Sequence, residues 1–202
     1  IILEKEKNIS VGDFLDKKNE AQKELRYKYE ALSAKVQYPH KEVMWDPYLL
    51  GLWLGDGFKR EKMICGSYDD LEILTWLKNH AEEKNYRSYI TNYFGGLGKK
   101  LLWRFSWSDP NMKGKNNWFA KTLQNNKHIP QEYIINSECN RLKLLAGMID
   151  SDGSYEKGRF TITNTDLSLL KQFQDIARSL GFRAKIHKPS VSGITNSIKY
   201  NL

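Results

Sequence analysis

The sequence has few cysteines, no long apolar run and no secretory signal. Its 202 residues include two cysteines, Cys65 and Cys139, which lie far apart and match no metal-binding spacing. The most apolar stretch, Tyr48–Leu54, is far too short to cross a bilayer and is flanked by charged residues. We therefore expect two buried, inert thiols, a reducing intracellular compartment (cytoplasmic or nuclear), and no membrane partner.

Positive charge is concentrated in one part of the chain. The net charge is +8, but Ile1–Trp45 holds nine Lys and Arg against eight Asp and Glu, so this segment is nearly neutral. The remaining residues hold 23 Lys and Arg against 16 Asp and Glu. A basic excess among Trp and Tyr residues suits a polyanionic partner such as nucleic acid, although a merely soluble basic surface explains the charge equally well.

A nine-residue pattern occurs twice. Leu49–Gly57 reads LLGLWLGDG and Leu145–Gly153 reads LAGMIDSDG, so that Asp56 and Asp152 lie 96 residues apart. The segment that follows also recurs, because residues 68–90 align without a gap to residues 164–186. One structural unit is therefore present twice. Two units related by a pseudo-twofold axis would bring the two carboxylates together.

The pattern divides the chain into a lead-in (residues 1–45), a first unit (46–136) and a second unit (137–202). By the 96-residue offset, the second unit is expected to be incomplete at its C-terminal end. Periodicity and turn residues predict helices at 48–54, 70–84, 116–124, 137–151 and 167–180, and strands at 59–67, 88–94, 100–108, 158–163, 183–188 and from 197 onwards. Gly57 is expected to end the first helix in the left-handed conformation. Trp103, Trp107 and Trp118 are expected in the core, and His80 and His128 on the surface.

The repeated helices carry small residues four positions apart, at Gly51 and Gly55 and again at Gly147 and Ser151. Residues at i and i+4 share a helix face, so two such faces allow close backbone contact. Asp56 and Asp152 would then meet at two helix C-termini, where the dipole is negative and a cation is needed. Mg²⁺ suits this environment, since it takes carboxylate, carbonyl and water ligands. The sequence predicts a metal-assisted phosphodiester hydrolase whose metal ligands are the following residues: Asp56, Asp152 and the carbonyls of Gly55 and Ser151.

From about Pro47 to its end, the chain resembles the LAGLIDADG homing endonucleases, whose paired signature both nine-residue copies match. The resemblance implies an α+β fold, a pseudo-twofold pair of αββαββα units, and site-specific double-strand DNA cleavage with Mg²⁺. The first copy has Leu54 where the signature has its earlier acid. Asp150 holds that position in the second copy. The family's metal-binding acid is the later one, so Asp150 is expected to be structural or to support the ligands.

The lead-in resembles the segment that joins an intein's splicing domain to its endonuclease, on the basis of NISVGDFL at residues 8–15 and the polar stretch that follows. Inteins carry double-motif endonucleases as insertions, which implies a host protein. The chain begins at Ile1, without a splicing nucleophile, and has no terminal His-Asn. We therefore expect a piece excised from a longer protein, unable to splice by itself.

The sequence KHIP at Lys127–Pro130 resembles the family's Lys-x-Ile-Pro element, which makes Lys127 a third catalytic candidate. Reading of DNA is expected from the strands, because the major groove admits a β-ribbon. The candidate DNA contacts are Lys59, Arg60, Lys62, Lys99, Lys100, Arg104, Lys157, Arg159, Arg183, Lys185, His187, Lys188 and Lys199.

The combined prediction is a monomeric endonuclease that acts on a long asymmetric duplex target, because its two units differ in sequence. Two alternatives stay open. The same fold could bind nucleic acid without cleaving it, as a regulator or maturase does, or the chain could be a degenerate endonuclease. Retention of Asp56, Asp152 and Lys127 favours the nuclease.

Overall fold

The computed structural model describes residues 11–17, 20, 35–58, 61–95, 100–108, 110, 123, 127–156, 158–187, 190–191 and 198–201. The chain forms two compact units, Ile1–Ser33 and Ala34–Leu202. In the smaller unit the structure describes one short helix, α1 (Val11–Leu15). The predicted helix at 116–124 and Trp118 lie outside the described residues, apart from the buried Leu123. The other described helices and strands all lie in the larger unit.

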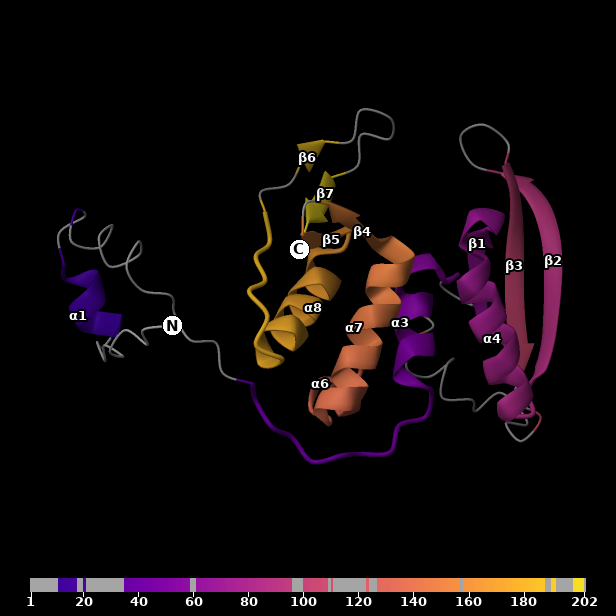
Figure 1. The fold of residues 1–202 in the computed structure, drawn as a ribbon, viewed down its shortest axis with the longest axis horizontal. Helices are drawn as coiled ribbons and strands as arrows, with labels where there is room; N and C mark the ends of the chain where they lie inside the picture. Colours follow the sequence, from indigo (N-terminus) through magenta and orange to yellow (C-terminus); the bar gives the residue numbers. More distant parts are fainter. Residues whose placement is uncertain are drawn as a thin grey trace, which may run out of the picture. The chain divides into compact units, whose positions relative to one another are not determined.

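Two helices lie side by side at the centre of this unit, α3 (Pro47–Asp56) and α7 (Glu138–Asp152) (Figure 1). The Asp46 side chain caps α3 by accepting from Tyr48 N at 2.8 Å, and Pro47 stands in the first turn, where its missing N–H costs nothing. Ser137 Oγ caps α7 by accepting from Asn140 N at 3.4 Å. Both predicted helices of the repeated motif are thus confirmed, and each has a side-chain cap at its N-terminus.

The first half of the duplication forms a three-stranded antiparallel sheet covered by one helix. Its elements are β1 (Met63–Ser67), the short 3₁₀ turn η1 (Tyr68–Asp70), α4 (Leu71–Glu83), β2 (Arg87–Gly95) and β3 (Lys100–Ser108). The strand order is β1-β3-β2, and β2 and β3 form the predicted hairpin. Alternate β3 residues Trp103, Phe105 and Trp107 are buried, as are Leu74 and Leu77 of α4. One face of the sheet therefore belongs to the core, and the other face is left open.

The second half repeats this arrangement with shorter strands. It consists of α6 (Gln131–Ile134), α7, β4 (Gly153–Glu156), β5 (Arg159–Asn164), α8 (Leu167–Ser179), β6 (Ser190–Val191) and β7 (Ile198–Asn201), with strand order β4-β5-β7-β6. Asp166 caps α8 by accepting from Ser168 N at 2.9 Å. Leu170, Phe173 and Ile176 of α8 are fully buried. The predicted α+β class is confirmed. Within the described ranges, no helix is long and apolar enough to span a bilayer.

The predicted strand at residues 183–188 is wrong for its described part, Arg183–His187, which has no strand partner there. The backbone carbonyl of Ala184 accepts instead from Gln174 Nε2 at 3.3 Å and from Arg178 Nε at 3.2 Å. Ile186 packs against the core. Side chains of α8 therefore hold this segment, and they bond to a backbone carbonyl that a strand would use for pairing.

One surface assignment, that of His80, and the core assignments of the two cysteines also need correction. His80 is only 8% exposed, because its ring stacks on Trp76 with centroids 4.8 Å apart. These residues lie four apart on α4, so they share a helix face. His128, in contrast, is partly exposed. Cys139 is exposed and Cys65 is partly buried, so neither is the buried thiol that was expected.

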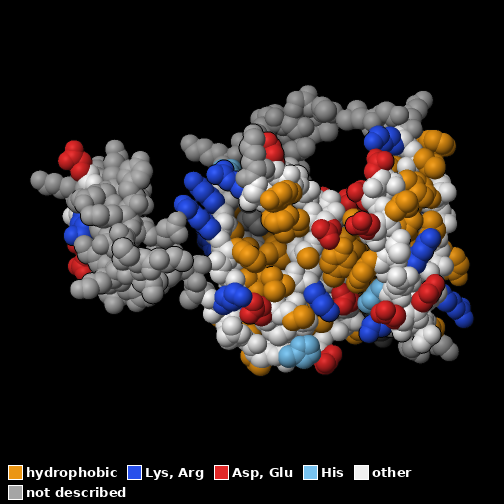
Figure 2. Space-filling view, in the orientation of Figure 1, with side chains coloured by type: hydrophobic (Ala, Val, Ile, Leu, Met, Phe, Trp, Pro, Cys, Tyr) orange, Lys and Arg blue, Asp and Glu red, His pale blue; other side chains and the backbone are white. Residues whose placement is uncertain are grey.

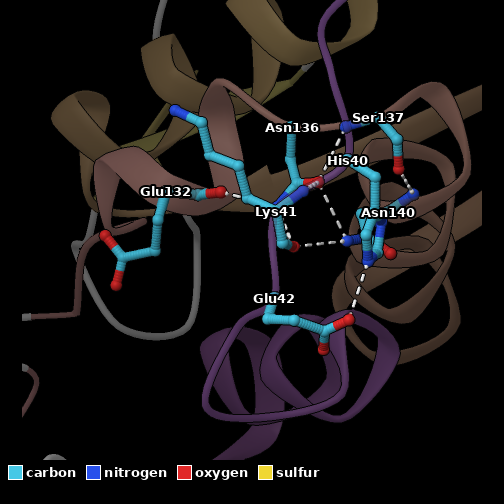
Figure 3. A network of polar contacts seen from close by, with 7 residues as sticks. All are labelled: His40, Lys41, Glu42, Glu132, Asn136, Ser137 and Asn140. Atoms are coloured by element: carbon cyan, nitrogen blue, oxygen red, sulfur yellow. Dashed lines mark hydrogen bonds and ion pairs between the residues drawn. The ribbon is translucent and has the colours of Figure 1, made fainter.

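A segment before α3 is bound to the second half by a buried amide. Asn136, which is fully buried, accepts from Lys41 N at 3.0 Å and donates to Lys41 O at 2.9 Å (Figure 3). The same side chain also contacts Glu132 O, Ser137 N and Asn140 Nδ2. All hydrogen-bonding positions of the amide are used, as a buried polar group requires.

Arg141 of α7 strengthens this attachment. Its fully buried guanidinium donates to Asn136 O at 2.9 Å, to Val36 O at 2.6 Å and to Ser179 Oγ, and it lies 5.0 Å from the Tyr38 ring. Burial lowers its pKa. The segment preceding α3 is thus joined to both α7 and α8.

Candidate active site

Backbone contact between α3 and α7 fixes the geometry of the site. A Cβ atom added at Gly51 would lie 2.4 Å from Leu144 O, and one added at Gly147 would lie 2.3 Å from Tyr48 O. Real side chains do not tolerate such distances, so the helices could not approach this closely without both glycines. The larger neighbours Leu52, Trp53 and Met148 are fully buried on other faces.

The same contact brings the ends of the two helices together. A Cβ added at Gly55 would lie 2.0 Å from Ser151 Oγ and 3.4 Å from Asp152 Cγ, so the end of α3 touches the carboxyl group that ends α7. Asp56 and Asp152 therefore converge, as the repeat predicts. Figure 2 shows acidic side chains gathered where α3 and α7 end.

Gly57 does not adopt the predicted left-handed conformation, and neither does Gly153 at the matching position of the second motif. Gly57 has φ −78° and ψ 151°, and Gly153 has φ −95° and ψ 166°, both extended. Glycine is needed here for space, because a Cβ at Gly57 would lie 2.3 Å from Trp53 O and one at Gly153 would lie 2.3 Å from Ile149 O. Each glycine lets the chain turn directly from the helix into the next strand.

Both carboxyl groups hold their protons more tightly than an ordinary aspartate. Desolvation and the charge of Asp152 raise the pKa of Asp56 to about 7, although the residue remains exposed to solvent at one side. Desolvation also raises the pKa of Asp152, against the opposing effects of Asn164 and Lys127. Two anionic groups forced together at negative helix ends are stabilised by a cation.

Lys127 supplies one such cation. Its Nζ donates to Gly55 O at 2.7 Å and lies 5.4 Å from the centroid of a Trp53 ring. Its charge lowers the pKa of both aspartates. The loop before α6 thus places an ammonium group at the end of α3, beside the carboxylate pair.

Asn164 is a site residue that the sequence did not reveal. Its Nδ2 donates to Asp152 Oδ2 at 2.9 Å, and its Oδ1 accepts from Asp166 N at 2.9 Å, so the amide is fixed in one orientation. An open hollow of about 460 Å³ adjoins it, lined by Ser151, Asp152, Gly153, Thr163, Asn164 and Thr165. The available signal was a run of polar residues at the end of a predicted strand.

The donor set fits a hard divalent ion. Two carboxylates and the carbonyl of Gly55 meet at one place, and the carbonyl of Ser151 has the matching place in the second motif; oxygen ligands of this kind suit Mg²⁺. Ser151 Oγ turns back to Gly147 O at 2.9 Å, so its hydroxyl is engaged by the helix. Within the described ranges no cluster of three His, Cys, Asp or Glu side chains exists, so such an ion would also need water or substrate oxygens.

The predicted DNA contacts are distributed over both halves. Lys62 is partly exposed just before β1, Arg104 is partly exposed on β3, and Lys100 is exposed and bonded to Asp69 at 3.0 Å. Arg159 is exposed at the start of β5. Arg183, Lys185 and His187 are exposed but lie on the irregular segment after α8, so their expected place on a strand is wrong. Lys199 lies on β7, and its side chain is not described. The structure does not describe Lys59, Arg60, Lys99, Lys157 and Lys188.

The chain is similar to known proteins in sequence and in fold. The family model of the LAGLIDADG-like domain matches residues 140–201. The replicative DNA helicase DnaB of Mycobacterium intracellulare is 30% identical over 172 residues, which is 83% of this chain and 25% of that protein. The chain therefore spans about a quarter of the length of this relative.

Solved structures of the homing endonuclease I-DmoI are similar in fold. Its complex with DNA and Mn has a TM-score of 0.53 at 20% identity and covers 77% of this chain and 86% of that one. Its complex with DNA and Ca has a TM-score of 0.52 at 19% identity, with 77% and 80% covered. The chain thus has the LAGLIDADG homing endonuclease fold and carries a LAGLIDADG-like domain.

Proposed function

We propose that the protein is a site-specific endonuclease that hydrolyses both strands of duplex DNA with Mg²⁺, in the manner of a homing endonuclease. The observation that carries this proposal is the convergence of Asp56 and Asp152 at the ends of a rigid helix pair. The likeness to I-DmoI, solved in complex with DNA and Mn or Ca, supports it.

The residues have distinct roles in this proposal. Asp56 and Asp152 would hold the metal, with the carbonyls of Gly55 and Ser151 as further ligands. A bound Mg²⁺ lowers the pKa of water and offsets negative charge on phosphate. Lys127 adds a positive charge near the scissile phosphate, since its ammonium already lies at Gly55 O. Asn164 keeps the Asp152 carboxylate in one orientation.

DNA would lie across the open faces of the two sheets. The part of the chain after Trp45 carries an excess of seven positive charges, which suits the phosphate backbone. The two halves differ in sequence and strand length, so the target would be long and asymmetric. A single chain supplies both halves, and we propose that it acts as a monomer.

We also propose that this endonuclease is inserted in a host protein as part of an intein. Its match to a helicase DnaB over a quarter of that protein's length supports this, together with the lead-in sequence before the first motif. The sequence that flanks this chain in its parent protein tests the idea. Splicing motifs on both sides are expected, and their absence would refute it.

The nuclease is tested with the purified full-length parent of this chain on a randomised duplex library, by selection for binding and then for Mg²⁺-dependent cleavage. The wild type should enrich one sequence and cut it. Asp56→Asn and Asp152→Asn should each reduce double-strand cleavage by at least about 100-fold while binding stays within a few-fold, because the ligands are lost and the sheets remain. Removal of Mg²⁺ with EDTA should reduce cleavage by the wild type as strongly as either mutation does.

Two outcomes contradict the proposal. Binding of one sequence without cleavage at any metal concentration would identify a nucleic-acid-binding module or a degenerate endonuclease. Undiminished cleavage by either mutant would show that the converging carboxylates do not act in hydrolysis.

A further inference from the structure

The open face of the first sheet carries an arginine in an unusual setting. Arg104 lies on β3, the central strand, and its side chain is on the face opposite the buried Trp103 and Phe105. Its cross-strand partners on that face are Cys65 of β1 and Thr91 of β2. Both neighbours are short, so the guanidinium is the longest polar group at the middle of this face.

Two aromatic rings hold the guanidinium. Its Cζ lies 3.9 Å from the centroid of Tyr93 and 5.6 Å from that of Phe58. Both distances lie within the range of cation–π attraction. Arg104 therefore rests between a strand residue and the residue that follows the first motif by one position, and its planar group has a restricted orientation.

The hydrogen bonds of this arginine are incomplete. Its Nε is buried and has no hydrogen-bond partner, and among the described residues no carboxylate forms an ion pair with it. An ordered surface arginine is usually paired, as Lys100 is with Asp69 on the same sheet. Since Nε is buried, the terminal Nη groups are the part of the side chain that can reach an acceptor outside the protein, and the two rings restrict the plane in which these groups lie.

We propose that Arg104 is a specificity-determining residue that reads a guanine in the major groove. This rests on the proposed function and deepens it. The major groove admits a β-ribbon, and its floor faces the central strand of such a ribbon. Guanine presents two acceptors there, O6 and N7, which match the parallel donors of a guanidinium. Orientation by Tyr93 and Phe58 removes part of the ordering cost of that contact.

The alternative contact for a basic residue is a backbone phosphate, and the position of Arg104 argues against it. Phosphates flank the groove, so they are reached from the rim of the sheet by flexible, exposed side chains. Arg104 is central and only partly exposed. The two contacts also differ in consequence, because a phosphate contact adds affinity for every sequence and a base contact adds it for one.

The test compares Arg104→Lys with Arg87→Lys. Arg87 is an exposed arginine on the same face, at the start of β2, and both changes keep the charge. Each protein selects binding sites from a randomised duplex library at fixed salt. The wild type should require guanine at one position, and Arg104→Lys should relax this requirement by about 10-fold, because lysine keeps the charge and lacks the two parallel donors. Arg87→Lys should keep the wild-type preference.

A second variant tests the contribution of the aromatic rings separately from that of the Arg104 charge. Tyr93→Leu leaves Arg104 in place and removes the nearer ring, and it should weaken the guanine preference several-fold while thermal unfolding confirms that the protein is folded. If Arg104→Lys lowers affinity equally for all sequences and keeps the wild-type preference at every position, Arg104 contacts phosphate and this inference is wrong. If the wild type enriches no sequence, the proposed function itself fails.

Discussion

Asp56 ends α3 and Asp152 ends α7 in the same backbone geometry, yet the polar groups around the two carboxylates differ. Asn164 donates to Asp152 at 2.9 Å, whereas no described residue donates a hydrogen bond to Asp56. Lys127 instead bonds to the carbonyl of Gly55, the residue before Asp56. The duplication therefore preserves the helix ends and changes what surrounds them, so the two acids are not equivalent.

The difference has a cause in the strand pairing. Gly57 pairs with Ile64 and Gly153 pairs with Ile162, so the pairing partners are 98 residues apart, although the glycines are 96 apart. Two residues beyond Ile162 stands Asn164. Two residues beyond Ile64 stands Gly66, where an added Cβ would lie 2.1 Å from the Trp103 ring. The first half has no room for an amide at this place.

The largest expected effect comes from the element that both halves share. Gly147→Ala should lower the free energy of unfolding by about 3 kcal/mol, because its Cβ would force Tyr48 O and the whole helix pair apart. Urea unfolding measures the change. Ala146→Ser, at an exposed position on the same helix, is the control and should be nearly neutral. A loss below 1 kcal/mol for Gly147→Ala would mean that the helices are not in backbone contact.

The next expected effect, on metal binding, tests whether Asn164 makes Asp152 different from Asp56. Asn164→Ala should weaken binding of Mn²⁺ by about 10- to 100-fold at the Asp152 side, since groups that orient a ligand carry that much of the affinity. Calorimetric titration measures it. The matched control is Tyr68→Phe, which removes a hydroxyl bonded to Asn92 at 2.6 Å in the first half, away from the acids. Equal Mn²⁺ affinities in both variants would contradict the assignment of Asn164.

A smaller effect concerns pH and the metal-free protein. The folded pKa of Asp56, about 7, lies above its ordinary value of 3.8, so folding favours the protonated carboxyl. That contribution is complete below about pH 4 and is lost as pH rises through about 7. In EDTA, Asp56→Asn should therefore exceed the wild type in stability at pH 8 by roughly 1 kcal/mol, after allowance for solvent screening of an exposed group.

The same comparison at pH 5 provides the control. There the advantage of Asp56→Asn should shrink, because the wild-type carboxyl is then mostly protonated. Adding Mg²⁺ at pH 8 should stabilise the wild type and leave the mutant unchanged. If the stability advantage of Asp56→Asn did not depend on pH, it would come from packing and not from charge.

The sequence predicted the parts of this structure that follow from local pattern. The helix pair could be predicted because Gly51 and Gly147 occupy the same place in two copies of one motif, and the convergence of Asp56 and Asp152 follows from that symmetry. The β2–β3 hairpin could be predicted from alternating apolar residues around a glycine-rich turn. The hairpin thus follows from neighbours in sequence, whereas the helix pair follows from the symmetry of the repeat.

The missed features depend on side-chain contacts that the repeat and the hydrophobic pattern do not contain. Asn164 could not be found from a gapless alignment, because that alignment places it opposite Tyr68, and the strand pairing places it opposite Gly66. Likewise, the burial of His80 depends on stacking against Trp76, and the absence of a strand at Arg183–His187 depends on side chains of α8. Pattern analysis does not include such tertiary hydrogen bonds and packing.

The smallest expected effect concerns the earlier acid position of the motif, where the halves differ most in sequence. Leu54 is fully buried in the first motif, whereas Asp150 is exposed in the second and accepts from the Tyr48 hydroxyl at 2.7 Å. Asp150→Asn and Tyr48→Phe should each lower the free energy of unfolding by about 0.5 kcal/mol, as expected for one solvent-accessible hydrogen bond. The double mutant should lose little more than either single one.

These two variants should keep DNA cleavage within about threefold of the wild type, because the pair joins the start of α3 to α7 without touching the converging carboxylates. Chemical denaturation and a cleavage assay on the selected target measure both quantities on the same protein preparations. Asp152→Asn, two positions along the chain, is the internal contrast, with stability retained and cleavage lost. If Asp150→Asn instead abolished cleavage as Asp152→Asn does, the earlier acid would belong to the active site, and the second half would differ from the first in its chemistry as well as in its hydrogen bonds.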